Sequence, residues 1–406
     1  MNIKQAVLML SIGMVAYPSL ADVVIQPPVM KSIQQQAQEH TTWVEVSRGA
    51  LINNIREVRK ALNSTQLCVD VKADAYGHGI KLIMPTLLGE NIDCIAVGSN
   101  QEAQIARANR FSGQIIRARF ATPAEIKEAR QYNIEELVGN LEIALYIDQL
   151  ASLDNKVVPV HLVLNSGGLG QNGLELNSDS GQKDAIAISK MRYLKIVGIT
   201  TDYAINSKEE VEKGFIEFGK QTGWLFKNTQ LDRNQIKLQA ANDFAALAVP
   251  DAKLDSAKVG SVIYGNTFNM FHQFKNVMQF KSQVAAVNHY PSGSTVGEGH
   301  SATLKRDSKL ANIPVGFADG YRSVFGNKAY VFINGHRVPV IGKVSMNTLM
   351  ADVTDFPDIK TSDDVVLFGN QGAQSMTQTE AEQITDASLA ELYTVWGQLN
   401  ERVLVQ

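Results

Sequence analysis

The segment "QLCVDVKADAYGHGIKLIMPTLLGENIDCIAVG", residues 66–98, sets the pattern for the first two thirds of the chain. Two short apolar runs, residues 67–72 and 93–97, flank a longer segment of helical period. This order is typical of a β-strand, a helix and a second strand parallel to the first. Lys72 closes the first run. A lysine at the end of a buried strand is costly unless another group pairs with it or uses it.

The same alternation recurs as far as residue 264 and predicts eight strands. The predicted strands are residues 67–72, 93–97, 114–118, 135–139, 157–164, 194–200, 236–241 and 257–264. Helix candidates lie between them, such as "TPAEIKEARQY", where Thr122 is a plausible N-cap, and "SKEEVEKGFIEFGKQTGWLF", where Ser207 precedes an acidic first turn. Eight strand–helix pairs predict an α/β fold, a (β/α)₈ barrel over residues 46–275, with chemistry at the carboxyl ends of the strands. Lys72 would then lie at the barrel mouth.

From residue 276 the pattern changes to strands separated by turns. The stretch "KAYVFINGHRVPVIGKVSM" predicts a hairpin with Asn334-Gly335 as its two-residue turn. We therefore expect a C-terminal all-β domain over residues 276–406, with one helix at residues 378–387.

The composition is that of an ordinary globular protein, with 45% hydrophobic and 19% charged residues and a formal net charge of −3. No basic run or interleaving of aromatic and basic residues offers the electrostatic pattern of nucleic-acid binders. Nucleic acid is therefore not an expected partner.

The N-terminus predicts a signal peptide over residues 1–21. Lys4 precedes an apolar stretch, and Ser19-Leu20-Ala21 provides a small-x-small cleavage site. The mature chain would begin near Asp22 with a polar connector, residues 22–45, and would not be held in a membrane. The alternative, a membrane anchor, would need an apolar run of about 20 residues.

The chain has two cysteines, Cys68 and Cys94. They lie on strands predicted to be adjacent, and an even count in an exported protein favours a disulfide between them. Two buried free thiols are the alternative.

Lys72 itself has two interpretations. An amine at a barrel rim suits Schiff-base chemistry, because partial burial helps it to lose its proton and attack a carbonyl. Asp70, two residues earlier on the same strand face, offers a simple ion pair instead.

The string "VKADAYGHG" resembles the pyridoxal phosphate attachment site of the alanine racemase family, with Lys72 at the position of the Schiff-base lysine. Further stretches resemble that family's successive motifs in order, from about Trp43 to Gln406. They are "HLVLNSGGLGQNG", "LKIVGITTDYA", "LQAANDFAAL", "LDSAKVGSVIYGN", "STVGEGHSATLKRDSKLANIPVGFADGYRS" and "GKVSMNTLMADVTD". The export signal, the cysteine pair, "LNSGG" and "SMNT" most resemble the periplasmic, broad-specificity amino-acid racemase branch.

The resemblance implies a barrel plus a β domain, a pyridoxal phosphate cofactor and a head-to-tail homodimer with active sites across the interface. It also implies two bases, because a proton taken from one side of Cα must be returned on the other. One is the lysine, and the other is a tyrosine of the second subunit.

Several of the family's site positions carry other residues here. Around the cofactor, the histidine beside the ring falls on Asp202, the phosphate-binding serine falls on Asp243, and the arginine facing the pyridine nitrogen falls on Lys258. Around the substrate, the opposite-face tyrosine falls on Glu298, the arginine near the substrate carboxylate falls on Gln171, and the entrance tyrosine falls on Phe317. Tyr76 and Gly260 match phosphate contacts, and Met346 matches the backbone position that faces the substrate carboxylate. The substitutions make the mouth more negative than the family pattern, where a phosphate and a carboxylate must bind.

Two hypotheses follow. The first is a periplasmic racemase of small-molecule amino acids, with Lys72 as one base and Glu298 in place of the other. The second is a catalytically silent relative whose acidic mouth holds a cationic ligand, a metal ion or a protein partner. The sequence predicts racemase activity far below that of the family, because an added carboxylate opposes the phosphate.

Overall fold

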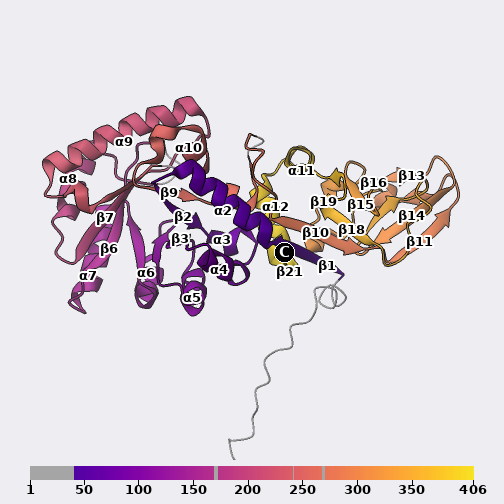
Figure 1. The fold of residues 1–406 in the computed structure, drawn as a ribbon, viewed down its shortest axis with the longest axis horizontal. Coiled ribbons are helices and arrows are strands. Elements are labelled where there is room, and N and C mark those ends of the chain that lie inside the picture. The colour runs from indigo at the N-terminus through magenta and orange to yellow at the C-terminus, as the bar shows by residue number, and fades with distance from the viewer. Residues whose placement is uncertain (1–40, 169–171, 241, 268–269) are drawn as a thin grey trace, which may run out of the picture.

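The computed structural model describes residues 41–168, 172–240, 242–267 and 270–406. The chain forms two regions, an α/β barrel at one end and a β domain at the other (Figure 1). The predicted signal peptide, residues 1–21, lies outside the described residues.

Eight parallel strands build the barrel, in the order β8-β7-β6-β5-β4-β3-β2-β9. They are β2 (Gln66–Asp70), β3 (Cys94–Val97), β4 (Gln114–Arg117), β5 (Ile134–Val138), β6 (Val158–Val163), β7 (Leu194–Thr200), β8 (Lys237–Gln239) and β9 (Ser256–Val259). The strands β8 and β9 approach each other and nearly close the ring, since Gln239 Nε2 donates to Ser256 Oγ at 3.2 Å. The predicted (β/α)₈ barrel is confirmed.

Most of the predicted strands end earlier than expected, and two of these early ends, in β2 and β9, bear on the site. The backbone leaves β2 at Asp70, so Lys72 follows the strand and does not belong to it. The strand β9 ends at Val259, and Ser261–Tyr264 forms a 3₁₀ turn (η4). After β9 the apolar run continues because Val262, Ile263 and Tyr264 in the turn are buried, whereas after β2 only Val71 extends the run before Lys72.

Helices surround the barrel (Figure 1). They are α2 (Arg48–Leu62), α4 (Ile80–Gly89), α5 (Asn100–Ala108), α6 (Pro123–Ala129), α7 (Leu141–Ser152), α8 (Asp179–Ser189), α9 (Lys208–Asn228) and the short α10 (Asp243–Ala248). Short 3₁₀ turns are η1 (Arg130–Tyr132), η2 (Arg233–Gln235) and η3 (Pro250–Lys253). The predicted N-caps are present, because Thr122 accepts a hydrogen bond from Glu125 N and Ser207 from Glu210 N.

A nine-stranded sheet, in the order β11-β14-β17-β16-β15-β18-β10-β1-β21, forms the β domain. Its strands are β1 (Thr42–Ser47), β10 (Met278–Gln283), β11 (Ala286–Tyr290), β14 (Ser308–Ile313), β15 (Tyr330–Ile333), β16 (His336–Ile341), β17 (Leu349–Asp352), β18 (Asp364–Phe368) and β21 (Glu401–Val405). Two small ribbons add β12 (Thr295–Val296) with β13 (Ala302–Thr303), and β19 (Asn370–Gln371) with β20 (Gln374–Ser375). Further 3₁₀ turns are η5 (Glu298–His300), η6 (Phe317–Asp319) and η7 (Ser323–Phe325).

The predicted hairpin is present, with Ile333 paired to His336 around Asn334-Gly335. Both turn residues have positive φ, 51° and 80°, as the tight turn requires.

The predicted connector, residues 22–45, ends inside a strand. Strand β1 begins at Thr42 and pairs antiparallel with β10 and parallel with β21. These partners lie in the last third of the chain, so the strand could not be assigned from local pattern alone.

Two helices, α11 (Gln378–Thr385) and α12 (Leu389–Leu399), lie near the end of the chain, where we expected one. Helix α12 buries Leu389, Leu392, Tyr393 and Trp396. It packs on the turn that follows β2 and so connects the β domain to the barrel mouth.

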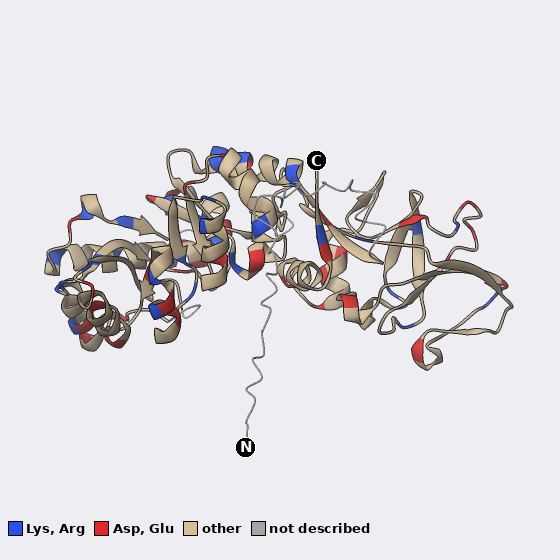
Figure 2. Cartoon of the chain, turned by 90° about the horizontal axis from the view of Figure 1, so that it is seen from below, with Lys and Arg blue, Asp and Glu red and all other residues tan. Residues whose placement is uncertain are grey.

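Charged residues of both signs are interspersed along both regions (Figure 2). Among the helices of the described ranges, none is both long enough and apolar enough to cross a membrane.

Candidate functional site

The strand β2 brings an acid and the candidate lysine together at the barrel mouth. Asp70, the last residue of β2, is almost fully buried, with 3% of its side chain exposed, whereas 41% of the Lys72 side chain is exposed. Lys72 Nζ lies 2.9 Å from Asp70 Oδ2, and the Lys72 backbone N–H donates to Asp70 Oδ1 at 3.2 Å. The ion pair is therefore present.

This pair controls the protonation of Lys72. Burial lowers the pKa of the Lys72 amine, but the charge and hydrogen bond of Asp70, together with the charges of Asp243 and Asp202, outweigh it and raise the pKa above its ordinary value. The mouth therefore holds Lys72 as an ammonium ion.

Lys72 opens a left-handed turn, α3 (Lys72–Tyr76). Ala73, Asp74, Ala75 and Tyr76 have φ between 52° and 58°. Non-glycine residues pay about 1–2 kcal/mol each for this conformation. The surrounding structure must therefore hold the turn in place.

Three contacts hold the turn. Glu102 accepts the backbone N–H of Asp74 at 3.0 Å, Asp74 Oδ1 accepts Ile80 N at 2.7 Å, and Arg402 pairs with Asp74 Oδ2. Gly77 follows with φ 81°, and a Cβ there would lie 2.1 Å from the carbonyl oxygen of Tyr393 in α12. The last helix of the chain thus packs directly against the residues behind Lys72.

Tyr76 projects from this turn toward Asp70 and Gly260. Its ring stacks on Tyr264, with 5.0 Å between centroids, and its hydroxyl donates to Asp70 Oδ2 at 3.5 Å. A Cβ on Gly260 would lie 2.5 Å from the Tyr76 hydroxyl, so only glycine fits there without movement. Burial, followed by the charges of Asp70 and Asp243, raises the pKa of Tyr76 well above its ordinary value, so the hydroxyl stays protonated.

Asp243 begins α10 and points to the turn after β9. Its Oδ1 accepts the backbone N–H groups of Gly260 at 3.0 Å and Val262 at 2.9 Å, and its Oδ2 accepts Gly260 N at 3.2 Å. Burial raises the pKa of this carboxyl group, while the two N–H groups and Lys72 favour the charged form. We call Asp70, Lys72, Tyr76, Asp243 and Gly260 the mouth cluster.

The other predicted barrel residues lie around this cluster. Asp202 follows β7, and its Oδ1 accepts the backbone N–H of Tyr203 at 3.0 Å. Lys258 lies in β9 opposite Cys68 of β2. Gln171 lies outside the described residues.

Cys68 and Cys94 form a disulfide between the neighbouring strands β2 and β3, with 4.5 Å between Cα atoms. The predicted pairing is therefore present, directly below the mouth cluster in β2.

The remaining predicted residues lie in the β domain. Glu298 at the start of η5, Phe317 at the start of η6 and Met346 line one cavity of about 620 Å³. Phe317 and Met346 are 43% and 58% exposed. We call these three residues the β-domain patch. Within one chain the described contacts do not bring the patch to the mouth cluster.

The sequence analysis missed three residues of the site. Tyr264 stacks on Tyr76 and donates to the backbone oxygen of Asp70 at 3.0 Å, and buried His78 stacks on Tyr264 at 4.6 Å between centroids. Glu102 receives three backbone N–H groups, two of them in the loop after β3. The Ser99-x-x-Glu102 spacing is a capping-box signature and could have identified Glu102. No local signal marks the two ring contacts.

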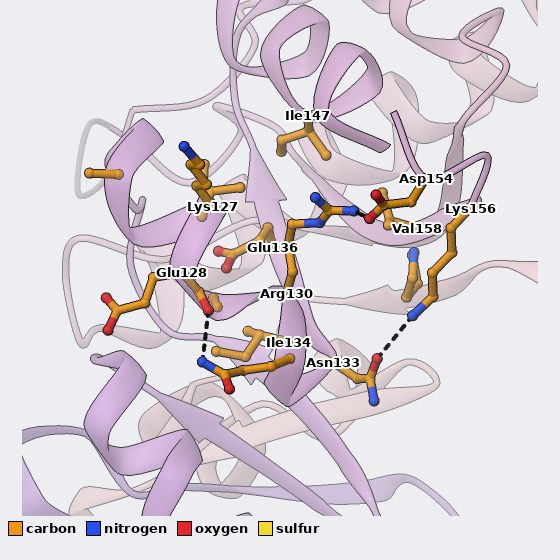
Figure 3. Close-up of a pocket in the computed structure, with 15 residues that line it drawn as sticks. Lys127, Glu128, Arg130, Asn133, Ile134, Glu136, Ile147, Asp154, Lys156 and Val158 are labelled. Atoms are coloured by element: carbon orange, nitrogen blue, oxygen red, sulfur yellow. Dashed lines mark hydrogen bonds and ion pairs between the residues drawn. The ribbon is translucent and has the colours of Figure 1, made fainter. Parts of the chain in front are cut away.

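A larger cavity, about 850 Å³, lies away from the mouth between α6, η1, α7 and the first residues of β5 and β6 (Figure 3). Arg130 and Asp154 pair across it, and Lys156 donates to Asn133 Oδ1 at 3.3 Å. It opens near the amino-terminal ends of the strands, where barrels of this kind do not carry their chemistry. We therefore do not place the functional site there.

In the part of the chain that the structure describes, no group of three or more His, Cys, Asp or Glu side chains is placed to hold a metal ion.

The fold and the lysine at its mouth define a class of two-domain barrel proteins, and two family descriptions match it. "Alanine racemase, N-terminal domain" matches residues 46–267, and "Alanine racemase, C-terminal domain" matches residues 277–404. The chain belongs to the alanine racemase family.

Its relatives include racemases of broad specificity. The chain is 50% identical over 369 residues to the broad specificity amino-acid racemase of Pseudomonas putida KT2440, covering 91% of this chain and 90% of that protein. It is 47% identical over 408 residues to that of Pseudomonas taetrolens, covering 100% and 99%. It is 44% identical over 381 residues to the lysine racemase of Proteus mirabilis, covering 93% of each.

Solved structures share the fold. The alanine racemase of Clostridium difficile 630 matches with a TM-score of 0.81 and 24% identity, over 90% of this chain and 96% of that one. The alanine racemase of Bartonella henselae with covalently bound pyridoxal phosphate matches with a TM-score of 0.79 and 24% identity, over 90% and 100%.

Proposed function

We propose that this chain is an exported, homodimeric member of the broad-specificity amino-acid racemase branch that does not racemise amino acids at a useful rate. The observation that carries the proposal is the 2.9 Å ion pair between Lys72 and Asp70. A Schiff base forms from a neutral amine. Asp70 and the neighbouring acids raise the pKa of Lys72 and favour the ammonium form.

Pyridoxal phosphate, the cofactor of the family, would supply an aldehyde for the lysine and a ring that accepts electrons from Cα. The residues of the mouth do not fit it. Lys72 is paired with Asp70. Asp243 puts a carboxylate at the position that matches the phosphate-binding serine, and Asp202 puts another at the position that matches the histidine beside the cofactor ring. Two like unit charges about 4 Å apart repel by ~4 kcal/mol at an effective dielectric constant near 20. We therefore assign no step of a racemase mechanism to this chain.

The second base is also altered. Glu298 occupies the position that a tyrosine holds in the family, and it is exposed in the β domain. In a head-to-tail homodimer, the β-domain patch of one copy would face the mouth cluster of the other. A carboxylate there would add negative charge to a mouth that already holds three acids, Asp70, Asp202 and Asp243.

Amino-acid racemisation is the second candidate function. The 50% identity to a broad specificity racemase and the position of Lys72 directly behind β2 favour it. In that case Lys72 and Glu298 would be the two bases, and the substrates would be small-molecule amino acids.

Cofactor loading and turnover distinguish the two functions. The full chain is incubated with pyridoxal phosphate, its visible spectrum is recorded before and after borohydride reduction, and D-amino acids formed from an L-amino-acid mixture are measured. We expect no visible absorption band and racemisation at least about a thousandfold slower than that of a broad-specificity racemase.

Two variants complete this experiment. Asp70→Asn removes the carboxylate that stabilises the ammonium form of Lys72. This change should increase the reaction of Lys72 with pyridoxal, which has no phosphate. Lys72→Ala is the control that removes the amine. Robust racemisation by the parent chain that disappears in Lys72→Ala would overturn the proposal in favour of the second candidate.

Export and assembly need separate measurements. Intact-mass analysis of periplasmic material should give a chain that begins near Asp22. Light scattering of the same material should give the mass of a dimer. A full-length monomer found only in the cell fraction that remains after the periplasm has been released would contradict both export and dimer formation.

A further inference from the structure

We propose that Asp243 excludes the phosphate group of the family cofactor by occupying its hydrogen-bond donors, and not only by charge repulsion. This inference deepens the proposed function and rests on it, because it identifies the residue that prevents cofactor binding.

The geometry of Asp243 carries the inference. The turn from Gly260 to Val262 presents two backbone N–H groups, and the Asp243 carboxylate accepts both of them at 2.9–3.2 Å. Gly260 matches the family glycine whose backbone approaches the phosphate, and Asp243 matches the serine that binds it. The carboxylate of the chain itself therefore takes the hydrogen bonds that a bound phosphate would need.

The surroundings fix the carboxylate in this position. Asn242 is the N-cap of α10, and its side chain accepts Ala245 N at 3.0 Å, which stabilises the first turn of the helix where Asp243 lies. On the other side, a Cβ on Gly260 would lie 2.5 Å from the Tyr76 hydroxyl, so the turn is packed closely against Tyr76. A phosphate could reach the two N–H groups only after Asp243 had rotated away.

The two explanations, that Asp243 fills the backbone N–H donors or that its charge repels the phosphate, predict different results for one substitution. Asp243→Asn removes the charge but keeps an oxygen of the same reach, which can still accept from Gly260 N and Val262 N. Asp243→Ala and Asp243→Ser remove the side-chain atoms that reach the turn. If occupancy dominates, asparagine should leave the donors filled, whereas alanine and serine should free them.

The test measures binding of inorganic phosphate and of pyridoxal phosphate to the full chain by calorimetry. All variants also carry Lys72→Ala, so that no covalent bond to the lysine contributes. We expect Asp243→Ala and Asp243→Ser to bind pyridoxal phosphate at least about tenfold more tightly than the Lys72→Ala parent, because two donors to a charged group become available. Asp243→Asn should stay within about threefold of that parent.

Pyridoxal, which lacks the phosphate, is the matched ligand control and should bind all variants alike. If Asp243→Asn binds pyridoxal phosphate as tightly as Asp243→Ala, repulsion alone explains the exclusion and the inference is wrong. If none of the three folded variants gains affinity, as checked by thermal unfolding, Asp243 is not the excluding residue. If Asp243→Ala does not fold, Asp243→Ser tests the same point, because it also frees the two donors. Racemisation by the unaltered chain would contradict the proposed function without deciding this result.

Discussion

The mouth cluster and the β-domain patch are the two halves of the predicted site. They differ in whether their side chains find partners within the same chain. In the mouth, Asp70, Lys72 and Asp243 are paired with one another or with backbone groups of the same chain. In the patch, Phe317 and Met346 are largely exposed. A site that pairs its own charges has less to offer a ligand, whereas an exposed apolar surface gains from a partner.

The largest effect should come from the carboxylate that anchors the mouth. Glu102 is 7% exposed and accepts the backbone N–H groups of Gly98, Ser99 and Asp74 at 2.7, 3.1 and 3.0 Å. Glu102→Ala leaves these three half-buried donors without a partner, and we expect a loss of about 3 kcal/mol in the free energy of unfolding. Denaturant unfolding measures it. The same change in the patch, Glu298→Ala, should cost less than about 0.5 kcal/mol, and equal losses would remove the contrast between the two regions.

The second prediction concerns pH. Burial lowers the pKa of His78 from 6.5 to about 4, against hydrogen bonds to the carbonyl groups of Ala75 and Tyr76 that raise it. The unfolded chain therefore binds this proton at a higher pH than the folded one. The contribution is fully present above pH 6.5 and is lost as the pH falls toward 4, by about 3 kcal/mol in total.

Denaturant unfolding between pH 4 and 7 measures this slope. The variant His78→Asn should flatten it by most of that amount. His300→Asn, a change at an exposed histidine next to the patch, is the matched control. A slope that survives in His78→Asn would show that other groups cause it.

The patch should affect association instead of folding. Phe317→Ser removes an exposed apolar side chain, and we expect self-association to weaken about tenfold, which corresponds to ~1.4 kcal/mol. Analytical ultracentrifugation over a range of concentrations measures this. Leu145→Ser, at an exposed apolar residue of α7 on the barrel, should leave association unchanged. A weakening of the same size in Leu145→Ser would show that the effect does not belong to the patch.

The smallest effect should come from the left-handed turn behind Lys72. Ala73 is exposed and has φ 52°. Ala73→Gly relieves the strain of this conformation but adds conformational freedom to the unfolded chain. We expect the free energy of unfolding, measured by thermal unfolding, to increase by about 0.5–1 kcal/mol. Ala124→Gly, in the first turn of α6, should instead lose about 0.5–1 kcal/mol. A loss in both would show that the turn is not strained at Ala73.

Local pattern was sufficient for the repeating part of the fold. The eight barrel strands, the caps at Thr122 and Ser207, and the turn at Asn334-Gly335 depend on residues close in sequence, and the structure confirms them. Strand β1 and helix α12 were missed. The partners of β1 lie more than two hundred residues away, and only three residues separate the end of α11 from the start of α12.

The candidate site divides in the same way. Family resemblance located Lys72, Tyr76, Asp243 and Gly260, but it predicted only that Asp243 would oppose a phosphate. The structure adds that Asp243 accepts N–H groups 17 and 19 residues further along the chain, and that Tyr76 stacks on Tyr264.

Residue type and spacing were enough to predict the order of strands and helices in the barrel and to favour the disulfide pair, because they set hydrophobic period, capping and strand order. Resemblance to a known family then added Asp202 and Asp243 as acids of the mouth. What those acids contact depends on the three-dimensional fold. Asp74 meets Arg402 from 328 residues away, and Asp70 lies between Lys72 and Tyr76. Such contacts form where distant segments converge, and the energy of a charge depends on the partner and burial that convergence gives it.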